Sequence, residues 1–371
     1  MDFLYFAVPS LLLLAGVLIT WLAIRRMRFL AAASYPRWRR MMEHVILLLV
    51  VTVTLAVGAY STYNAIAIHS SLAGYPPAGK LYVVHGHRMH LYCIGSGQPT
   101  IILESGLGQA SDLGWGEFQT KLAGMTRVCS YDRAGTGWSE PKTGPRDADQ
   151  IVAELHGLLA EARVTGPLVL MGHSYGGMYV RAYTARYRTD VAGMVLIDSS
   201  TPFQEERFRA LPEGSGEHSL ARRLAVVYAQ YLLGVPRFQG LCGGAGVALD
   251  TCNARFEIVR ESLRMPQSST EVARAGPFGY LPILIFSRDP SNVLSAPNSP
   301  KASVDHEVLW NKMQEELKGL STRSRRIIAR KSGHAVFATR EDLVLREVGF
   351  FLDQIRGRGP EPANYGSTAV E

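Results

Sequence analysis

The segment from Pro167 to Gly177, PLVLMGHSYGG, joins an apolar run to a helical pattern through an abrupt glycine-flanked turn. The turn reads Gly-x-Ser-x-Gly, which is typical of a tight connection between a strand and a helix. The flanking glycines remove side chains that would otherwise collide there. Ser174 would stand alone at the tip, beside the unpaired N–H groups of a helix expected over 175–185, where developing negative charge is favoured. We therefore interpret Ser174 as a nucleophile.

Two long apolar stretches precede this region. Residues 3–24 and 45–68 contain no charged side chain, and each is long enough to cross a ~30 Å hydrocarbon core as a helix. The connector at 25–40 carries six arginines and no acidic residue, which predicts a cytoplasmic loop. Residues 1–69 are therefore expected to form a transmembrane hairpin. A cleaved signal peptide is the alternative, but no basic segment precedes the first stretch and a second span follows it.

This topology determines how the charge and the localisation are interpreted. Of the formal net charge of +7, six charges lie in the connector, so the basic balance indicates a membrane protein and no nucleic-acid partner. A cytoplasmic connector places everything after the second span on the outer side. We expect a multi-pass protein of the cell (inner) membrane, with a lipid bilayer as partner and the remaining chain extracytoplasmic.

After a proline-containing linker at 70–79, the pattern becomes that of an α/β domain. Two strands are expected at 80–84 and 89–94, and six more within PTIILESGLGQ, TRVCSYDRAGTGWS, PLVLMGHS, VAGMVLIDSS, LPILIFSRD and SRRIIARKSGH. Continuous aliphatic runs separated by helical patterns are typical of a mostly parallel sheet that is covered on both faces. We expect an eight-stranded sheet formed by 80–200 and 281–357, a helical cap insertion at 201–280 over the strand ends, and a disordered tail at 358–371.

A serine hydroxyl becomes an effective nucleophile only when a base removes its proton and a third group orients that base. His334 follows the last expected strand, and functional residues of such sheets lie beyond the carboxyl ends of the strands. The acid remains open between Asp198 and Asp289, which end the fourth and fifth of the six strands. Asp198 is slightly favoured, because Ser287-Arg288-Asp289-Pro290 lacks the usual Gly-x-x-Asp turn.

An acyl-transfer site also needs N–H donors for the oxyanion. Tyr175 on the turn is one expected donor, and Leu107, in the glycine-bracketed loop after the first parallel strand, is the second. The cysteines are Cys93, Cys129, Cys242 and Cys252. An even number of cysteines outside the cytoplasm favours disulfides, although buried free thiols remain possible. No Cys-x-x-Cys or Cys/His spacing indicates zinc, and we expect no metal ion and no cofactor.

The segments ESGLG, YDRAGTGWS, GHSYGG and SGH, in this order, give residues 80–356 a resemblance to the α/β-hydrolase superfamily and to bacterial serine hydrolases within it. Two departures are Ser105, where many relatives have His, and the short turn at Asp289. Epoxide and haloalkane hydrolases of similar fold use Asp at the turn, so Ser174 argues against both. The fold that the resemblance implies puts the second and fourth strands side by side, which makes Cys93 and Cys129 disulfide partners.

These features together predict a serine hydrolase that cleaves carboxylic esters through an acyl-serine intermediate, and the membrane attachment favours a small, ester-like, lipophilic substrate. The alternatives that use the same three residues are an acyltransferase, an amidase, a lactonase or a perhydrolase, because the fold does not decide among them. A non-catalytic ligand-binding protein of this fold is a third hypothesis. Substrate choice is expected to depend on the insertion at 201–280.

Overall fold

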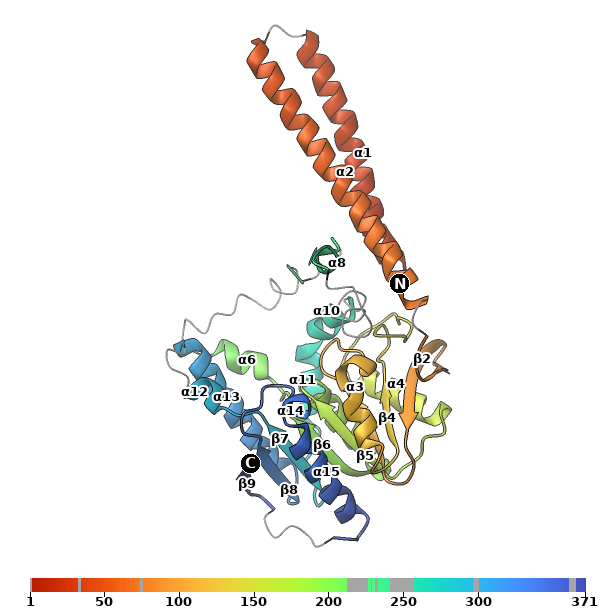
Figure 1. Ribbon diagram of the computed structural model, residues 1–371, viewed down its shortest axis with the longest axis vertical. Helices are drawn as coiled ribbons and strands as arrows, with labels where there is room; N and C mark the ends of the chain where they lie inside the picture. The colour runs from red at the N-terminus through yellow and green to blue at the C-terminus, as the bar shows by residue number, and fades with distance from the viewer. Residues whose placement is uncertain are drawn as a thin grey trace. The chain divides into compact units, whose positions relative to one another are not determined.

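The computed structural model describes residues 2–32, 35–73, 76–211, 226–227, 229–230, 233–240, 256–295, 300–359 and 365–371. The chain divides into two compact units. One consists of Met1–Pro76 with Leu224–Asn253, and the other of Pro77–Arg223 with Ala254–Glu371. The second unit contains the sheet, and its elements can be followed in Figure 1.

The sheet has nine strands in the order β1-β2-β4-β3-β5-β6-β7-β8-β9. The first two strands and the β2–β4 pair are antiparallel, and every pairing from β4 to β9 is parallel. The strands are β1 (Lys80–Val84), β2 (His87–Ile94), β3 (Thr100–Glu104), β4 (Val128–Tyr131), β5 (Leu168–His173), β6 (Val191–Ile197), β7 (Ile283–Ser287), β8 (Ser324–Ile328) and β9 (Thr368–Val370). The α/β fold with a mostly parallel sheet is therefore confirmed.

Helices cover both faces of this sheet. They are α3 (Ser111–Leu122), α4 (Ala148–Glu161), α5 (Gly176–Arg186), α6 (Gln204–Arg209), α10 (Phe256–Leu263), α11 (Met265–Ala273), α12 (Ser291–Leu294), α13 (Lys301–Glu316), α14 (Val336–Thr339) and α15 (Glu341–Ile355), with short 3-10 turns at Arg188–Asp190 and Leu317–Leu320. Because successive residues of a strand point to opposite faces, the strands β3 to β7 each supply side chains to both hydrophobic cores.

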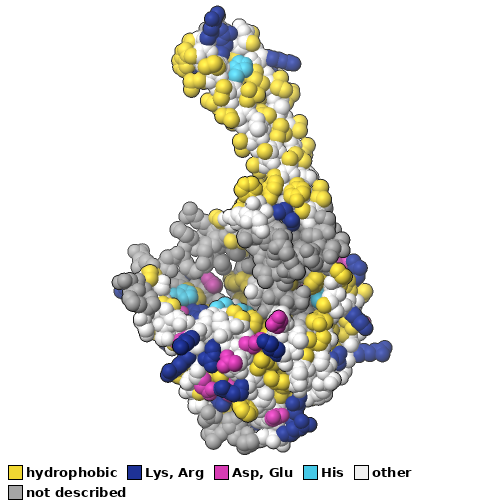
Figure 2. All heavy atoms as spheres, viewed as in Figure 1, with side chains coloured by type: hydrophobic (Ala, Val, Ile, Leu, Met, Phe, Trp, Pro, Cys, Tyr) yellow, Lys and Arg dark blue, Asp and Glu magenta, His cyan; other side chains and the backbone are white. Residues whose placement is uncertain are grey.

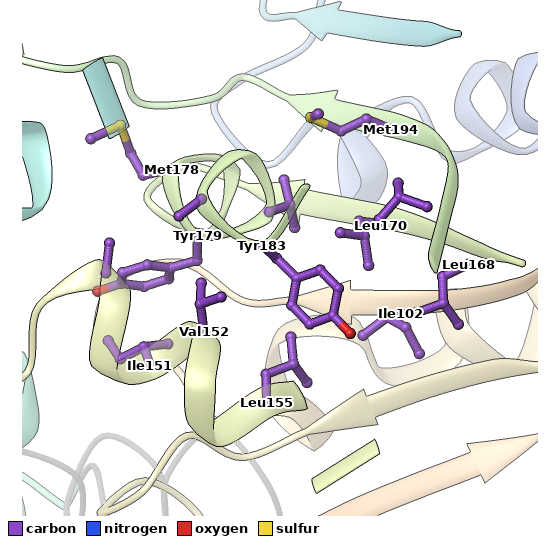
Figure 3. Close-up of a cluster of buried hydrophobic side chains, with 14 of the residues drawn as sticks. Ile102, Ile151, Val152, Leu155, Leu168, Leu170, Met178, Tyr179, Tyr183 and Met194 are labelled. Carbon is purple, nitrogen blue, oxygen red and sulfur yellow. The ribbon is translucent and has the colours of Figure 1, made fainter. Parts of the chain in front are cut away.

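The alternation is clear in β5. Leu168 and Leu170 pack in one core with side chains of α4 and α5, as Figure 3 shows, and Val169 and Met171 pack in the other with α3 and α15. All four side chains are at most 1% exposed. Burial on both faces explains why this strand reads as a continuous apolar run in the sequence.

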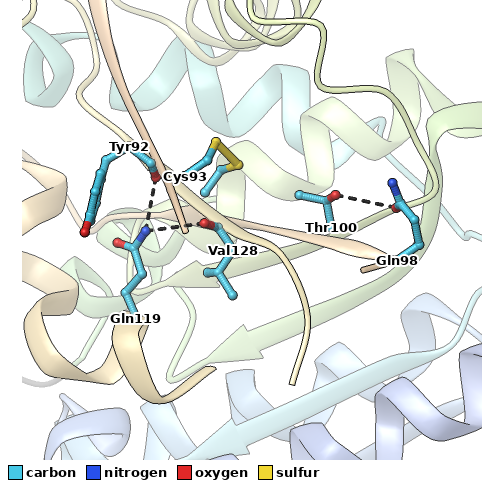
Figure 4. The surroundings of a disulfide bond; sticks show 7 residues. Tyr92, Cys93, Gln98, Thr100, Gln119 and Val128 are labelled. Carbon is cyan, nitrogen blue, oxygen red and sulfur yellow. Dashed lines mark hydrogen bonds between the residues drawn. A yellow bond between two sulfur atoms is a disulfide. The ribbon is translucent and has the colours of Figure 1, made fainter. Parts of the chain in front are cut away.

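A disulfide joins the two strands at the antiparallel side of the sheet. Cys93 of β2 lies directly opposite Cys129 of β4 and is bonded to it, so the expected pairing is confirmed. Gln119 of α3 donates its side-chain N–H to the carbonyls of Tyr92 and Val128 beside this bond (Figure 4). The expectation for Cys242 and Cys252 lies outside the described residues.

The other unit is dominated by two long helices, α1 (Asp2–Ala32) and α2 (Arg37–Ala73). Within it, Ser10–Ala32 and Arg37–Ala67 are long and apolar enough to cross a membrane, by length and composition. Figure 2 shows hydrophobic side chains along the outside of this helix pair. The two helices pack closely, since a Cβ added to Gly16 would lie 3.1 Å from the Leu55 side chain. The basic connector is mostly helical, because α1 and α2 extend into it from both sides.

Two other boundaries differ from those expected. The sheet has a ninth strand, β9, which pairs with β8, so the end of the chain is not entirely disordered as predicted for 358–371. The insertion expected as a single cap at 201–280 is divided between the units. Residues 224–253, including α8 (Val235–Phe238), group with the helix pair, whereas α6, α10 and α11 belong to the sheet unit.

The disulfide gives a stability prediction. Replacing both Cys93 and Cys129 with Ala should lower the free energy of unfolding by about 3–4 kcal/mol, because the bond closes a loop with a sequence separation of 36. Thermal unfolding of the full chain in detergent, with and without reductant, measures this. The variant and the wild type should unfold at different temperatures when oxidised and at the same temperature when reduced. Equal melting of the oxidised proteins would contradict the prediction.

Candidate active site

Ser174 lies at the sharp turn between β5 and α5. Its backbone is in the left-handed region, with φ of 53°, which L-residues rarely adopt. Gly172 permits the turn, since a Cβ there would lie 2.6 Å from the carbonyl oxygen of Gly176. The turn holds the Ser174 side chain at the carboxyl end of β5, beside the first N–H groups of α5.

The structure brings three of the predicted side chains into one hydrogen-bonded chain. Nε2 of His334 is 2.9 Å from Oγ of Ser174, and Nδ1 of His334 is 2.6 Å from Oδ2 of Asp198. Asp198 is fully buried, whereas the His334 side chain is 44% exposed. The arrangement therefore has a buried acid at one end and a solvent-accessible base and hydroxyl at the other. Such an order allows the histidine to accept the serine proton while the carboxylate stabilises the resulting charge.

Asp198 follows β6 and is held by groups that the sequence analysis did not identify. Its Oδ1 accepts hydrogen bonds from the indole N–H of Trp310 at 2.9 Å and from the backbone N–H of Arg288 at 3.1 Å. Burial alone would raise the pKa of this carboxyl. The hydrogen bond from His334 and the charge of Arg288 outweigh burial and hold the pKa below its ordinary value. Asp198 thus stays ionised without solvent.

The positive charge of Arg288 is shared between Asp198 and a second carboxylate. Its guanidinium lies 3.3 Å from Oδ2 of Asp198 and 2.6 Å from Oε2 of Glu307 on α13. Arg288 also stacks over the Trp310 ring, 4.8 Å from the ring centroid. The Glu307 carboxylate balances this cation, so the buried acid retains its negative charge toward His334.

Asp289, the other acid considered from the sequence, lies elsewhere in the hydrogen-bond network. Its Oδ1 accepts from the backbone N–H and the hydroxyl of Ser291, and its Oδ2 accepts from the backbone N–H of Lys331. These bonds stabilise the turn after β7 and tie it to the loop before His334. The geometry thus joins Asp198 to the histidine and gives Asp289 a role in loop structure.

His173 contacts both the backbone and the ring of His334. Its Nε2 lies 3.2 Å from the carbonyl oxygen of His334, and the two rings are 4.7 Å apart. Trp115 and Phe337 surround the His173 ring. Burial and the nearby His334 lower the pKa of His173 to about 4, so this imidazole is neutral near pH 7. It can therefore orient the loop without placing a second positive charge beside His334.

Two backbone N–H groups border the Ser174 side chain. Leu107 follows Gly106, at which an added Cβ would lie 3.4 Å from Cβ of Ser174, and Tyr175 follows Ser174 directly. Within the described part of the chain, neither amide donates a hydrogen bond to another protein group. Unpaired donors beside a nucleophile suit the negative oxygen of a tetrahedral intermediate.

A buried ionic cluster lies beneath this loop. Glu104, which ends β3, accepts hydrogen bonds from the hydroxyl of Tyr131 and from Nη1 of Arg133, the latter at 2.6 Å. Burial raises the pKa of Glu104 to about 7, more than the charge of Arg133 lowers it. Glu261 of α10 also faces Arg133. One guanidinium thus serves two carboxyl groups, and near pH 7 one of them, Glu104, is partly protonated.

Only some residues of the candidate site can be identified from sequence motifs. Ser174, His334 and the loop of Leu107 follow strand ends and are identifiable from the sequence. Trp310 lies in a helix with no motif, and its bond to Asp198 spans 112 residues. Arg133 belongs to the DRAGTGWS segment that follows β4, so this motif is the sequence signal from which its position can be found.

A mostly parallel sheet with a serine at the turn after its central strand defines the class of α/β-fold hydrolases. Residues 81–347 match the model of the alpha/beta hydrolase family, and the chain belongs to that family. The resemblance stated from the sequence motifs is confirmed at this level.

Individual relatives match only parts of the chain. An uncharacterized protein, YqjL, from Bacillus subtilis is 35% identical over 120 residues, which is 32% of this chain and 47% of that protein. A proline iminopeptidase from Saccharolobus solfataricus is 31% identical over 127 residues, covering 32% of this chain and 39% of that protein. The chain therefore matches less than half the length of these relatives.

Among solved structures, an esterase from Exiguobacterium antarcticum, EaEST, is similar with a TM-score of 0.51 and 15% identity. The match covers 74% of this chain and 99% of the esterase. At this identity the similarity shows the fold alone.

The raised pKa of Glu104 gives a testable pH dependence. A carboxyl whose folded pKa is about 7, above its ordinary 4.5, contributes stability below pH 4.5 that is lost as the pH rises through 7. The free energy of unfolding should therefore fall between pH 5 and pH 8, by on the order of 3 kcal/mol from this group. Glu104→Gln, which keeps the hydrogen-bond acceptor, should flatten that fall in denaturant titrations of the full chain.

Glu154→Gln is the matched control. Glu154 is equally buried and pairs with Arg146, but its pKa lies below the ordinary value. This variant should keep the wild-type slope between pH 5 and pH 8. A Glu104→Gln protein with the same slope would contradict the interpretation.

Proposed function

We propose that this protein is a membrane-anchored serine hydrolase that cleaves carboxylic esters through an acyl-Ser174 intermediate. The observation that carries the proposal is the hydrogen-bonded order Ser174, His334, Asp198, with contacts of 2.9 and 2.6 Å. These are the distances that proton transfer from a nucleophile to an oriented base requires. Membership of the hydrolase family supports the same chemistry.

The side chains and amides of the candidate site can carry out each step of ester cleavage. Oγ of Ser174 attacks the ester carbonyl while Nε2 of His334 removes its proton, and the Leu107 and Tyr175 amides donate to the oxyanion. His334 then gives the proton to the departing alcohol. Water, activated by the same imidazole, cleaves the acyl-serine. The 44% exposure of the His334 side chain suits this last step, because water can reach the base.

Amide cleavage by the same three residues is the second candidate. The similarity to the proline iminopeptidase supports testing it, although that similarity covers only 32% of this chain. Short p-nitrophenyl esters, the matching anilides and added alcohols as acyl acceptors separate ester hydrolysis, amide hydrolysis and acyl transfer. If the protein is an ester hydrolase, kcat/KM should be higher for the esters than for the anilides, and water should be the preferred acyl acceptor.

We further propose that the helix pair spans the cell membrane with the catalytic unit outside. The arginines at the connection between α1 and α2 support this orientation, because such residues remain on the cytoplasmic side. The disulfide between Cys93 and Cys129 supports an oxidising compartment for the sheet unit. Protease accessibility of the sheet unit in intact cells tests the orientation.

Ser174→Ala should lower kcat for a p-nitrophenyl ester by at least about 10⁴-fold, because the nucleophile is lost while the amide donors remain. A fluorophosphonate probe should label the wild type and not the variant. Steady-state kinetics and labelling of the full chain in detergent measure both effects.

Ser324→Ala is the control for this experiment. Ser324 is a fully buried serine on β8, so the same substitution there tests for general damage. It should leave ester turnover and labelling unchanged. Wild-type turnover by Ser174→Ala would refute the proposed chemistry.

The two aspartates should respond differently to the same substitution. Asp198→Asn removes the acceptor that sets the His334 tautomer and should lower kcat by about 10⁴-fold. Asp289→Asn should leave kcat within about threefold of the wild-type value. It should lower the free energy of unfolding by about 1 kcal/mol, because it weakens only the hydrogen bonds of the turn. Kinetics and thermal unfolding of both variants measure the contrast. A larger loss of kcat from Asp289→Asn would reverse the assignment of the acid.

A further inference from the structure

Glu261 is a buried carboxylate on α10, within the insertion between β6 and β7. Its Oε1 lies 2.9 Å from Nε of Arg133, and its Oε2 lies 3.2 Å from Nη2 of the same guanidinium. The hydroxyl of Tyr179 donates to Oε2 as well, at 3.3 Å. Both charged side chains are at most 2% exposed. A bidentate, desolvated ion pair of this kind fixes the orientation of the guanidinium plane.

The opposite edge of that guanidinium holds the loop that precedes Leu107. Nη1 of Arg133 donates to the carbonyl oxygen of Ser105 at 2.9 Å, and Nη2 donates to the carbonyl oxygen of Gly106 at 2.6 Å. Nη1 also pairs with Glu104. Arg133 thus connects a helix of the insertion with two consecutive peptide groups of the core.

The Gly106 carbonyl and the Leu107 N–H belong to one peptide group. A trans peptide is planar, so its C=O and N–H point in opposite directions. Fixing the oxygen therefore fixes the direction of the Leu107 N–H on the other side. A charged donor on the oxygen also polarises the amide and strengthens its N–H as a donor.

We propose that Glu261 acts through Arg133 as a positioning residue for the Leu107 oxyanion donor, so that the site is complete only when α10 is docked on the core. This inference rests on the proposed function, because it assigns a structural cause to one part of that mechanism. It also makes the insertion a contributor to the rate of the reaction in addition to substrate choice.

The ionic balance of the cluster explains why Arg133 depends on Glu261. Arg133 faces Glu104, Glu261 and the hydroxyls of Tyr131 and Tyr179 in a site without solvent. Burial raises the pKa of Glu104 to about 7, so that carboxyl is partly neutral near pH 7. Glu261 then supplies the bidentate anionic contact that orients the cation. Without that contact, the guanidinium can turn toward Glu104, and the Gly106 oxygen then keeps only the 3.2 Å hydrogen bond from the Gln109 N–H and loses its charged donor.

Glu261→Gln tests this because it keeps the shape of the side chain and removes its charge. We expect kcat for a p-nitrophenyl ester to fall about 10- to 100-fold with KM within about threefold, which is less than the 10²–10³-fold cost of losing an oxyanion donor outright. Affinity for an alkylboronic acid, which forms a tetrahedral adduct on the serine, should fall by the same factor. A purely structural role for Glu261 would not shift the two quantities together.

Arg133→Lys is the second variant. Lysine keeps the positive charge but cannot hold two carbonyls and a carboxylate in one plane. It should reproduce the loss of kcat and of boronic acid affinity. Thermal unfolding accompanies each measurement, and fluorophosphonate labelling of Ser174 reports whether folded protein is present in either variant.

Glu154→Gln is the matched control, since Glu154 and Arg146 form another ion pair in which both side chains are 1% exposed. It should lower stability comparably and leave kcat and boronic acid affinity unchanged. If Glu261→Gln and Arg133→Lys are folded and match the wild type in kcat and boronic acid affinity, the inference is overturned. The inference also fails if Glu154→Gln shows the same kinetic loss.

The Ser174→Ala protein separates this inference from the proposed function. Loss of turnover in Ser174→Ala together with wild-type kinetics in Glu261→Gln would reject the positioning role and leave the hydrolase mechanism intact. Full turnover by Ser174→Ala would reject both.

Discussion

The parallel arrangement of strands β3 to β8 is the constraint on which the candidate site depends. Parallel strands end at one edge of a sheet, so residues far apart in sequence meet there when each directly follows a strand. Ser174 follows β5, Asp198 follows β6, and His334 lies in the loop after β8. Ser174 and His334 are 160 positions apart in the sequence, and the strand order alone brings their side chains into contact.

Two buried ionic clusters flank the serine and follow one physical rule. A desolvated charge is tolerated only when it is paired and hydrogen-bonded. On one side Arg288 neutralises part of the charge of Asp198 and is itself balanced by Glu307. On the other side Arg133 lies between Glu104 and Glu261. In both clusters an arginine joins the core to a helix outside the sheet, so the helices restrain the loops that form the candidate site.

The sequence was informative wherever one segment determines its own environment. Strands such as β5 are buried on both faces and read as continuous apolar runs, so their existence and order could be predicted. The choice between Asp198 and Asp289 could not, because both follow strands. What distinguishes them is the indole of Trp310 and the guanidinium of Arg288, which reach Asp198 through tertiary packing. The strand Thr368–Val370 was missed because three residues provide no periodic pattern.

Part of the insertion packs on the helix pair within the same unit. Nε of Arg237 donates to Asn64 at 3.0 Å, and the ring of Phe238 meets that of Tyr60 edge to face at 6.1 Å. Asn64 lies 19 residues beyond Val45, or about 28 Å along a helix. Under the proposed topology these contacts lie at the outer boundary of a ~30 Å hydrocarbon core, where aromatic and polar side chains are favoured. One part of the insertion thus packs on the helix pair through Arg237, whereas another part, within the sheet unit, holds Arg133 through Glu261.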